Sequence, residues 1–238
     1  MSFDVRELWR FPVKSLQGEQ VEAIEVTAGG FVGDRAFGIV DDATGLVLTG
    51  RREPRLLQAA ATLAGEGAVA ITLPDGSVAP DDDALSTWLD RPVRLVAASA
   101  DRAGRYETQL DFEHEDTAEW FAWDGPPGPF HDSTRTRVSL VSLGTIGDWD
   151  RRRFRSNVVL SGAGEVALVG STAHLGAAEL DVQKEIDRCV MVTRPQPGGI
   201  DRDLDVLRTI HRDRAGNLGV GALVRTPGRV AVGDQLTI

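Results

Sequence analysis

The sequence contains a single cysteine, Cys189, which follows Arg188 in the segment DRCVMV. One thiol cannot form an internal disulfide, and a structural zinc site usually requires two or more thiolates. Two interpretations of Cys189 stay open. It is either an inert core residue, as isolated cysteines often are, or a soft metal ligand or nucleophile in a cationic environment. Arg188 is not expected to supply that charge, because neighbours in a strand face opposite ways.

Two basic sites near the N-terminus form a second candidate. Lys14 and Ser15 lie together in FPVKSL, and Arg35 follows the turn GGFVGD. An ammonium, a hydroxyl and a planar guanidinium would together suit a phosphate dianion. The alternative is structural: Lys14 extends its ammonium to solvent, and Arg35 pairs with Asp34 or Asp41.

A third candidate is RRRFRSNVV, residues 151–159, which reads as a strand. The period of two would place Arg153, Arg155 and Asn157 on one face, which could form a pocket wall. The alternative is a solvated strand edge protected by its charges. Nearby, VSLVSLGT supplies the hydroxyls of Ser142 and Thr145, which by themselves do not indicate a function.

Composition narrows the classes of function. The chain has 26 Lys and Arg against 36 Asp and Glu, a net charge of −10, which disfavours a general nucleic-acid binder. An anionic ligand would therefore need a local concentration of positive charge. The common nucleotide, hydrolase and zinc-protease motifs are missing from the sequence, and its four histidines have no metal-ligand spacing. With no signal-like segment and no long apolar run, we expect a cytoplasmic protein without a membrane or nucleic-acid partner.

The pattern of β-prone runs and turns predicts a mainly β protein with a few helices. One helix is expected after the acidic residues 81–83, and an amphipathic helix over residues 203–213. Residues 101–134 read as loop because of the proline-rich DGPPGPF, so we place a boundary between residues 1–100 and 101–238 there. The C-terminal segment is predicted to form a hairpin that turns at TPGR.

Taken together, these segments resemble proteins in which a MOSC N-terminal β-barrel precedes a MOSC domain. Such proteins are related to the C-terminal part of molybdenum cofactor sulfurases and to amidoxime-reducing enzymes. The similarity covers nearly the whole chain. It is carried, in order, by FPVKSLQGE, GGFVGDRAFGIVD, LTGRREPRLL, FHDST, VSLVSLGTI, RFRSNVVLSG, DRCVMVTRPQP, LDVLRTI and the closing GRVAVGDQL. It implies a MOSC-like β-barrel, residues 101–238, packed against a smaller N-terminal β-barrel-like domain, residues 1–100.

The resemblance also implies a site for a molybdenum cofactor, with molybdenum bound by a molybdopterin and by Cys189. It places the phosphate of the molybdopterin on Lys14, Ser15 and Arg35. The other pocket residues that it implies are Ser142, Thr145, Arg155 and Asn157. This chain departs from the family before the cysteine, where an acidic pair and a tryptophan usually stand; here the segment is SGAGEVALVGSTAHLG, and Glu165 is the nearest replacement.

The implied function is reduction of N-hydroxylated small molecules by a molybdenum oxidoreductase. Electrons would come from a separate donor protein of the ferredoxin or flavin/haem reductase type, because the sequence contains no cysteine-rich ferredoxin module. Two alternatives stay open. One is a sulfur carrier or transferase that uses a Cys189 persulfide, and the other is a non-catalytic protein that binds or carries the cofactor.

Overall fold

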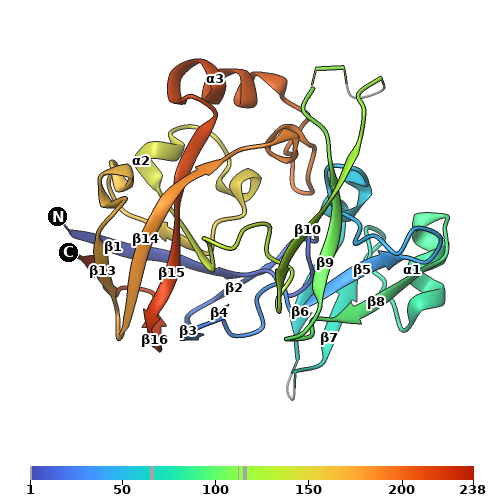
Figure 1. Cartoon of the computed structure of the whole chain (residues 1–238), viewed down its shortest axis with the longest axis horizontal. Coiled ribbons are helices and arrows are strands. Elements are labelled where there is room, and N and C mark those ends of the chain that lie inside the picture. The colour runs from blue at the N-terminus through green and yellow to red at the C-terminus, as the bar shows by residue number, and fades with distance from the viewer. Residues whose placement is uncertain (1, 65–66, 112, 115–116) are drawn as a thin grey trace.

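The computed structural model describes residues 2–64, 67–111, 113–114 and 117–238 (Figure 1). Within these residues a ring of seven strands closes into a barrel, in the order β12-β11-β15-β14-β13-β17-β1, because β12 also pairs with β1. Strand β2 extends the sheet beyond β1. The strands of this sheet are β1 (Ser2–Arg10), β2 (Glu19–Val21), β11 (Val138–Ser142), β12 (Val158–Leu160), β13 (Thr172–Leu175), β14 (Ala178–Asp187), β15 (Asn217–Thr226) and β17 (Gln235–Thr237).

The barrel interior forms the main hydrophobic core. Ala178, Leu180 and Val182 of β14 are buried at alternate positions, as the two-residue period of a strand requires. They pack with Leu8 of β1 and Leu140 of β11 in one cluster. All neighbouring strands of the ring are antiparallel except the parallel pair β11 and β12.

A smaller part, on the right of Figure 1, has a core of its own. Strand β5 (Phe37–Asp41) pairs with β8 (Val93–Ala97), and β6 (Ala60–Leu63) pairs with β7 (Val69–Thr72). Helix α1 (Asp82–Leu89) and the 3₁₀ helix η1 (Pro54–Gln58) contribute buried leucines to the same core. The expected fold class, a MOSC-like barrel against a smaller N-terminal β-barrel-like part, is confirmed.

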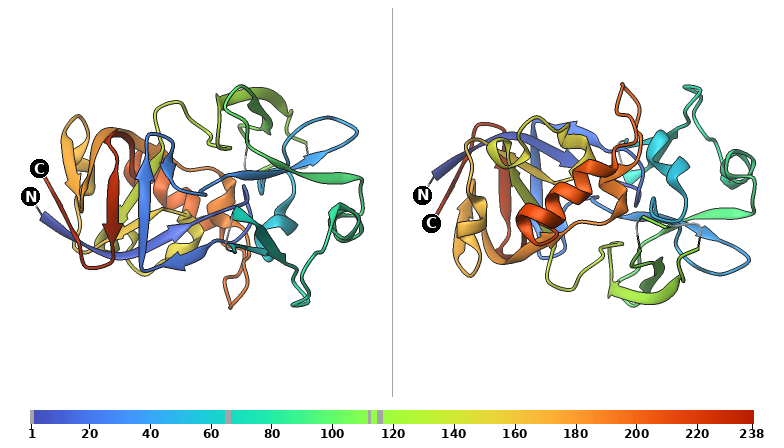
Figure 2. Two further views of the ribbon diagram at one scale, coloured as in Figure 1. Left: turned by 90° about the horizontal axis from the view of Figure 1, so that it is seen from below. Right: turned by 90° about the horizontal axis from the view of Figure 1, so that it is seen from above.

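The two parts share strands. Besides β1 in the barrel, β3 (Ala23–Thr27) pairs with β4 (Gly30–Phe31) and with β16 (Gly228–Ala231) from the C-terminal end. Figure 2 shows the resulting elongated molecule, with both termini at the barrel end. These strand pairs join segments from both ends of the chain. The division at residue 100 stays a prediction.

Both expected helices are confirmed. Asp81 caps α1 by accepting a hydrogen bond from the backbone N–H of Ala84 at 2.9 Å. Helix α3 (Leu204–Arg214) lies at the top of the barrel in Figure 1 and buries Val206, Leu207 and Ile210. A third helix among the described residues, α2 (Leu143–Ile146), follows β11 directly. None of the described helices is long and apolar enough to cross a membrane.

Two of the expectations about local structure outside the cavity are wrong. Residues 101–134 are not all loop, because β9 (Ala103–Thr108) pairs with β10 (Phe121–Pro127) in a two-stranded ribbon. Within the described residues β10 has no second partner strand, so its prolines interrupt no further ladder. Residues 112 and 115–116 of this stretch lie outside the described residues.

The predicted C-terminal hairpin is also absent from the described part of the chain. Strand β15 pairs with β11 and β14, whereas β16 pairs with β3 and β17 with β1 and β13. At the start of β16 the chain passes so close to Ala177 that a Cβ on Gly228 would lie 2.3 Å from the Ala177 carbonyl oxygen. The turn at TPGR therefore redirects the chain into another sheet.

Candidate anion and cofactor cavity

A cavity of about 330 Å³ lies between the barrel and the smaller part. Lys14, Ser15, Arg35, Thr49 and Arg51 line it from the N-terminal side. The barrel side and the segment before it contribute His131, Asp132, Ser133, Thr136, Arg137, Ser139, Arg153, Phe154, Arg155, Asn157, Lys184, Ile186, Asp187, Arg188, Cys189, Met191 and Val192. Six of the eight residues predicted to bind a cofactor or metal are brought together here, and Ser142 and Thr145 are not.

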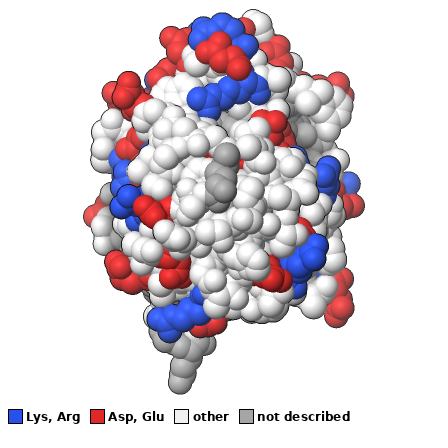
Figure 3. All heavy atoms as spheres, turned by 90° about the vertical axis from the view of Figure 1, so that its left-hand side faces the viewer, with Lys and Arg blue, Asp and Glu red and all other residues white. Residues whose placement is uncertain are grey.

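The lining is strongly cationic although the whole chain is acidic. Eight of its side chains are Lys or Arg and two are Asp, whereas the chain as a whole carries a net charge of −10. His131 adds no charge at neutral pH, because burial and then the nearby Arg35 lower its pKa to about 4. Such a surface favours an anionic ligand. On the face seen in Figure 3, by contrast, acidic and basic side chains alternate around a broad uncharged centre.

Cys189 lies just after β14, at the start of the 3₁₀ helix η5 (Val190–Thr193). Its side chain is half-buried, and Sγ accepts a hydrogen bond of 3.3 Å from Nε of Arg51. The interaction with Cys189, and to a smaller extent with Asp132, raises the pKa of Arg51 above its usual value against the opposing effect of burial. The cysteine is therefore not sealed in the hydrophobic core.

Arg188 lies at the cavity as well, contrary to the expectation that it faces away from Cys189. The expectation assumed a strand, but β14 ends at Asp187. Arg188 donates from Nε to the Leu218 carbonyl and from Nη1 to the Phe154 carbonyl, both at 2.8 Å. In the described structure its Nη2 is buried without a hydrogen-bond partner, and so is Oγ1 of Thr49, another lining residue.

Lys14 is buried and does not extend its ammonium to solvent. Nζ donates to the Phe130 carbonyl at 2.9 Å and to Oδ1 of Asp132 at 2.8 Å, and lies 4.4 Å from the centre of the Tyr106 ring. Burial lowers the pKa of Lys14 to about 8 against the opposing effect of Asp132. Although burial works in the other direction, Lys14 and Arg51 hold the pKa of Asp132 well below its usual range. Both groups are thus charged at neutral pH.

Arg35 and Arg155 lie over the same aromatic ring. Their guanidinium carbons are 5.5 and 4.4 Å from the centre of Phe11. Arg35 makes the ion pair with Asp34 that the structural alternative predicts, yet it still lines the cavity. Burial, followed by Arg35, lowers the pKa of Arg155 to about 9, so Arg155 also stays charged at neutral pH.

Three cavity residues have left-handed backbones. Ser15, Arg35 and Arg155 have φ values of 69°, 51° and 50°. Among the described residues the other non-glycine examples are Asp90 and Ala215, which end helices α1 and α3, where this conformation is common. Arg155 likewise ends the 3₁₀ helix Arg151–Phe154, whereas Ser15 and Arg35 end no helix. Backbone strain of this kind concentrates at functional sites.

The segment of residues 151–159 folds differently from the predicted strand. Arg151–Phe154 is a 3₁₀ helix, and the strand β12 begins only at Val158. Arg153 is buried rather than solvated, and donates to the carbonyls of Val192 and Asp201 at 3.1 and 2.8 Å. It therefore joins this segment to the chain that follows Cys189.

Asn157 fixes the wall of the cavity through its amide. Its Oδ1 accepts hydrogen bonds from the backbone N–H and the hydroxyl of Ser139, at 3.1 and 2.8 Å. Its Nδ2 donates to the carbonyl of Trp9 at 3.2 Å. Asn157 thereby links β1 to β11 beside the cavity.

Ser142, Thr145 and Glu165 lie elsewhere, in a buried cluster of their own. The Thr145 hydroxyl donates to Glu165 at 2.7 Å, and the Ser142 hydroxyl bonds to both of them. Glu165 is completely buried and does not line the cavity. It therefore does not replace the acidic and aromatic wall that the resemblance led us to expect.

Neither Arg51 nor Asp132, which connect the site, is among the residues predicted from the sequence. Both lie in segments that carried the family resemblance, LTGRREPRLL and FHDST. The only local sequence feature that marks Arg51 is the glycine before it, Gly50, which indicates a turn. No group of three or more His, Cys, Asp or Glu in the described residues could hold a metal by itself. A metal bound at Cys189 would thus need most of its ligands from a cofactor.

Comparison with known proteins gives the family. The MOSC N-terminal beta barrel domain matches residues 2–122, and the MOSC domain matches residues 132–237. None of the curated proteins compared with the chain matches it. Among solved structures, the chain is similar to the YUAD protein from Bacillus subtilis (15% identity, TM-score 0.46, 99% of this chain and 94% of that one). It is also similar to YiiM from Geobacillus stearothermophilus (16% identity, TM-score 0.36, 49% of this chain and 66% of that one).

MOSC domains are associated with proteins that bind the molybdenum cofactor. The first match covers just over half of the chain, and the second covers most of the remainder. This chain therefore belongs to the MOSC family, with a MOSC N-terminal beta barrel domain followed by a MOSC domain.

Proposed function

We propose that the protein is an oxidoreductase that binds a molybdenum cofactor through Cys189 and reduces N-oxygenated small molecules. The observation that carries the proposal is the position of the Cys189 sulfur, which lies half-buried in a cavity whose lining has eight basic and two acidic side chains. A thiolate is a soft ligand suited to a metal already bound by sulfur. The cations suit a phosphate on the same ligand.

The residues present fit such a group in three respects. The soft donor Cys189 and the cations Lys14 and Arg35 line one cavity, so a single ligand can contact all of them. Nη2 of Arg188 and Oγ1 of Thr49 are buried at that cavity without partners in the described structure, so both can donate to a ligand there. A buried polar atom left without a partner costs free energy, on the order of 1–3 kcal/mol.

The roles of the residues follow from their contacts. Lys14, Ser15 and Arg35 would hold the phosphate, and Arg155 would extend the positive surface along the Phe11 ring. Asp132 holds the Lys14 ammonium in place, and Ser139 holds the Asn157 amide. When bound, the cofactor would supply the two-electron chemistry that removes oxygen from nitrogen. The residues of the chain would position the cofactor and compensate its negative charge.

Reduction of an N–OH bond to N–H consumes two electrons and two protons and releases water. The electrons must come from a separate protein, and we propose a donor of the ferredoxin or flavin/haem reductase type. A cytoplasmic location would give access to such donors.

A persulfide carrier is the second candidate, favoured by the half-exposed sulfur beside the Arg51 guanidinium. It would bind no molybdenum. A donor persulfide would transfer its outer sulfur atom to Cys189 and leave as a thiol, so that Cys189 would carry an additional sulfur atom. A non-catalytic cofactor carrier, in contrast, would bind molybdenum and reduce nothing.

One experiment separates the three functions. The protein is produced in a host that makes the cofactor, and molybdenum per chain is measured by elemental analysis for wild type, Cys189→Ala and Cys189→Ser. N-hydroxylated amidines are then supplied with a chemically reduced viologen as electron donor. We expect one molybdenum per wild-type chain, little in either variant, and reduction only by wild type. Wild-type protein without molybdenum, or with molybdenum but no reduction, would overturn the proposal.

A further inference from the structure

Arg51 joins the sulfur of the site to its phosphate-binding cations. Its Nε donates to Cys189 Sγ at 3.3 Å, and its Nη2 lies 3.8 Å from Oδ1 of Asp132. The same oxygen accepts the 2.8 Å hydrogen bond from Lys14 Nζ. One carboxylate thus connects the guanidinium beside the sulfur with the Lys14 ammonium.

The backbone around Arg51 is held by a tight turn. The N–H groups of Arg52 and Glu53 both donate to the Thr49 carbonyl, at 3.0 and 2.8 Å. Gly50 lies against the segment that follows the cysteine, since a Cβ at this position would lie 3.0 Å from Cε of Met191. From the same segment, Arg194 donates to the Arg51 carbonyl at 3.1 Å. The turn is therefore fastened to the chain that carries Cys189.

The neighbouring arginine provides a natural contrast. Arg52 points away from the cavity, where its guanidinium lies 4.6 Å from the centre of the Trp120 ring and 3.7 Å from a Glu107 oxygen. Its side chain is about half exposed, whereas that of Arg51 is largely buried. The turn thus directs one of two adjacent arginines to the sulfur and the other to solvent.

We propose that Arg51 is a positioning residue, which holds the Cys189 sulfur toward the cavity and keeps it aligned with the Lys14–Asp132 pair. The inference rests on the proposed function for its role toward a cofactor. The contact between Arg51 and Cys189 does not depend on any cofactor. Groups that hydrogen-bond to metal ligands orient them and tune the metal, and their loss typically lowers metal affinity about 10- to 100-fold.

The contact is tested first in protein made without the cofactor. The arginine side-chain Nε–H signals are recorded by NMR, with Arg51→Lys and Arg52→Lys used to assign the two resonances. We expect the Arg51 signal to shift in Cys189→Ala, because its acceptor is removed, and the Arg52 signal to stay unchanged. An Arg51 signal that is the same in wild type and Cys189→Ala overturns the inference, whatever the protein binds.

The role is tested in protein from a host that makes the cofactor, with Arg51→Ala, Arg51→Lys and the matched control Arg52→Ala. We expect Arg51→Ala to lose molybdenum about 10- to 100-fold faster on dilution than wild type, and Arg52→Ala to match wild type. Arg51→Lys keeps the positive charge but lacks the planar guanidinium group. Its rate of molybdenum loss should lie between those of Arg51→Ala and Arg52→Ala. The midpoint potential of the remaining bound metal should be more negative in Arg51→Ala, because a cation beside the sulfur has been removed.

The outcomes distinguish the two proposals. Wild type without molybdenum overturns the proposed function, and the NMR comparison then still decides whether Arg51 holds the sulfur. Molybdenum bound equally well, at an unchanged potential, by wild type, Arg51→Ala and Arg52→Ala overturns the positioning role alone. If Arg51→Ala does not fold, Arg51→Lys decides in the same way.

Discussion

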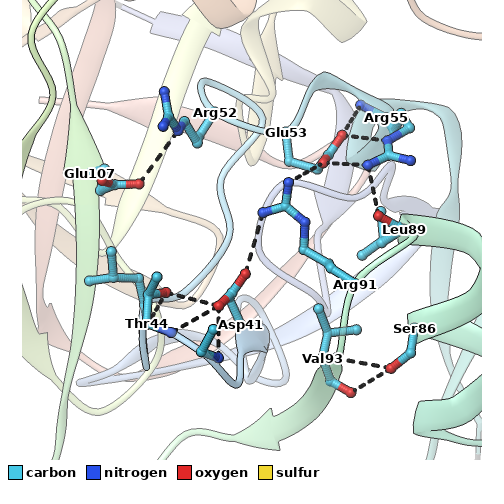
Figure 4. A network of polar contacts seen from close by, with 12 residues as sticks. Asp41, Thr44, Arg52, Glu53, Arg55, Ser86, Leu89, Arg91, Val93 and Glu107 are labelled. Carbon is cyan, nitrogen blue, oxygen red and sulfur yellow. Dashed lines mark hydrogen bonds and ion pairs between the residues drawn. The ribbon is translucent and has the colours of Figure 1, made fainter.

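The cavity differs from a second arginine-rich region of the same protein in how its charges are paired. In the network of Figure 4, Arg55 contacts Glu53 at 2.7 Å, and Arg91 lies 3.3 Å from Asp41 and 3.5 Å from Glu53. With Arg52 and Glu107, this region has three guanidinium groups and three carboxylates. The cavity lining has eight cations and two carboxylates.

This difference separates a structural network from a binding site more clearly than the number of arginines does. Where guanidinium groups and carboxylates are equal in number, they pair with one another. Little net charge then remains to attract an ionic ligand. An excess of buried or half-buried cations around an open volume is costly unless an anion compensates it. Arg51 and Arg52 are adjacent in sequence but belong to different regions, so neither composition nor local sequence could make this distinction.

The largest expected effect comes from removing cations of the cavity. Lys14→Ala and Arg35→Ala each delete a charge that we assign to the phosphate, and a charged hydrogen bond contributes about 1.5–3 kcal/mol. Cofactor content should fall about 10- to 100-fold in either variant, measured as molybdenum and molybdopterin per chain after gel filtration. Arg55→Ala, which removes a cation from the balanced network, is the matched control and should retain the wild-type content. Equal content in all three variants would show that cation excess has no bearing on binding.

A smaller effect is expected from breaking the balanced network. Arg55→Ala removes the two hydrogen bonds of 2.7 Å that the Arg55 side chain donates to the buried Glu53 carboxylate. The carboxylate keeps only Arg91 and the backbone N–H of residue 55 as the partners described for it. The free energy of unfolding should fall by about 1–2 kcal/mol, as seen in urea or thermal denaturation. Arg94→Ala is the comparison, because it breaks an exposed ion pair with Asp42 and should change stability by less than about 0.5 kcal/mol. If Arg55→Ala were as stable as wild type, this result would show that the network has no structural role.

The smallest effect is a pH dependence that only the cavity should show. Burial lowers the pKa of Lys14 to about 8, so its charge is present below that pH and lost above it. Anion affinity should therefore decrease as the pH rises from 7 to 9, by about threefold to tenfold. Sulfate is the probe, because its own charge is constant in this range, and calorimetry is the measurement. In Lys14→Arg the guanidinium stays charged, so the decrease should largely disappear; an equal decrease in both proteins would assign it to another group.

Much of the fold follows from local sequence patterns. The acidic residues before residue 84 and the amphipathic period over residues 203–213 give α1 and α3 where they are predicted. Local patterns do not predict which strands pair, because pairing depends on contacts between residues far apart in the chain. Gly228 packs closely against Ala177, and β16 pairs with β3, which lies some two hundred residues earlier. Nothing in the local turn sequence distinguishes this arrangement from a hairpin.

The candidate site could be predicted only in part, for the same reason. Lys14, Ser15, Arg35 and Cys189 were found because residue type and family resemblance agreed, and the structure brings them to one cavity. Arg51 was missed because its role depends on a turn that packs against Met191, across the interface between the two parts. Conversely, Ser142 and Thr145 bond to Glu165, a pairing across about twenty residues that no spacing rule indicates.

The most direct test of the account is the position of molybdenum relative to Cys189. Crystals of protein from a host that makes the cofactor would be measured at the molybdenum absorption edge, and an anomalous difference map would locate the metal. The account predicts one peak within bonding distance of Cys189 Sγ, inside the cation-lined cavity. A molybdenum peak anywhere else, or an empty cavity in protein shown by elemental analysis to contain the metal, would contradict it.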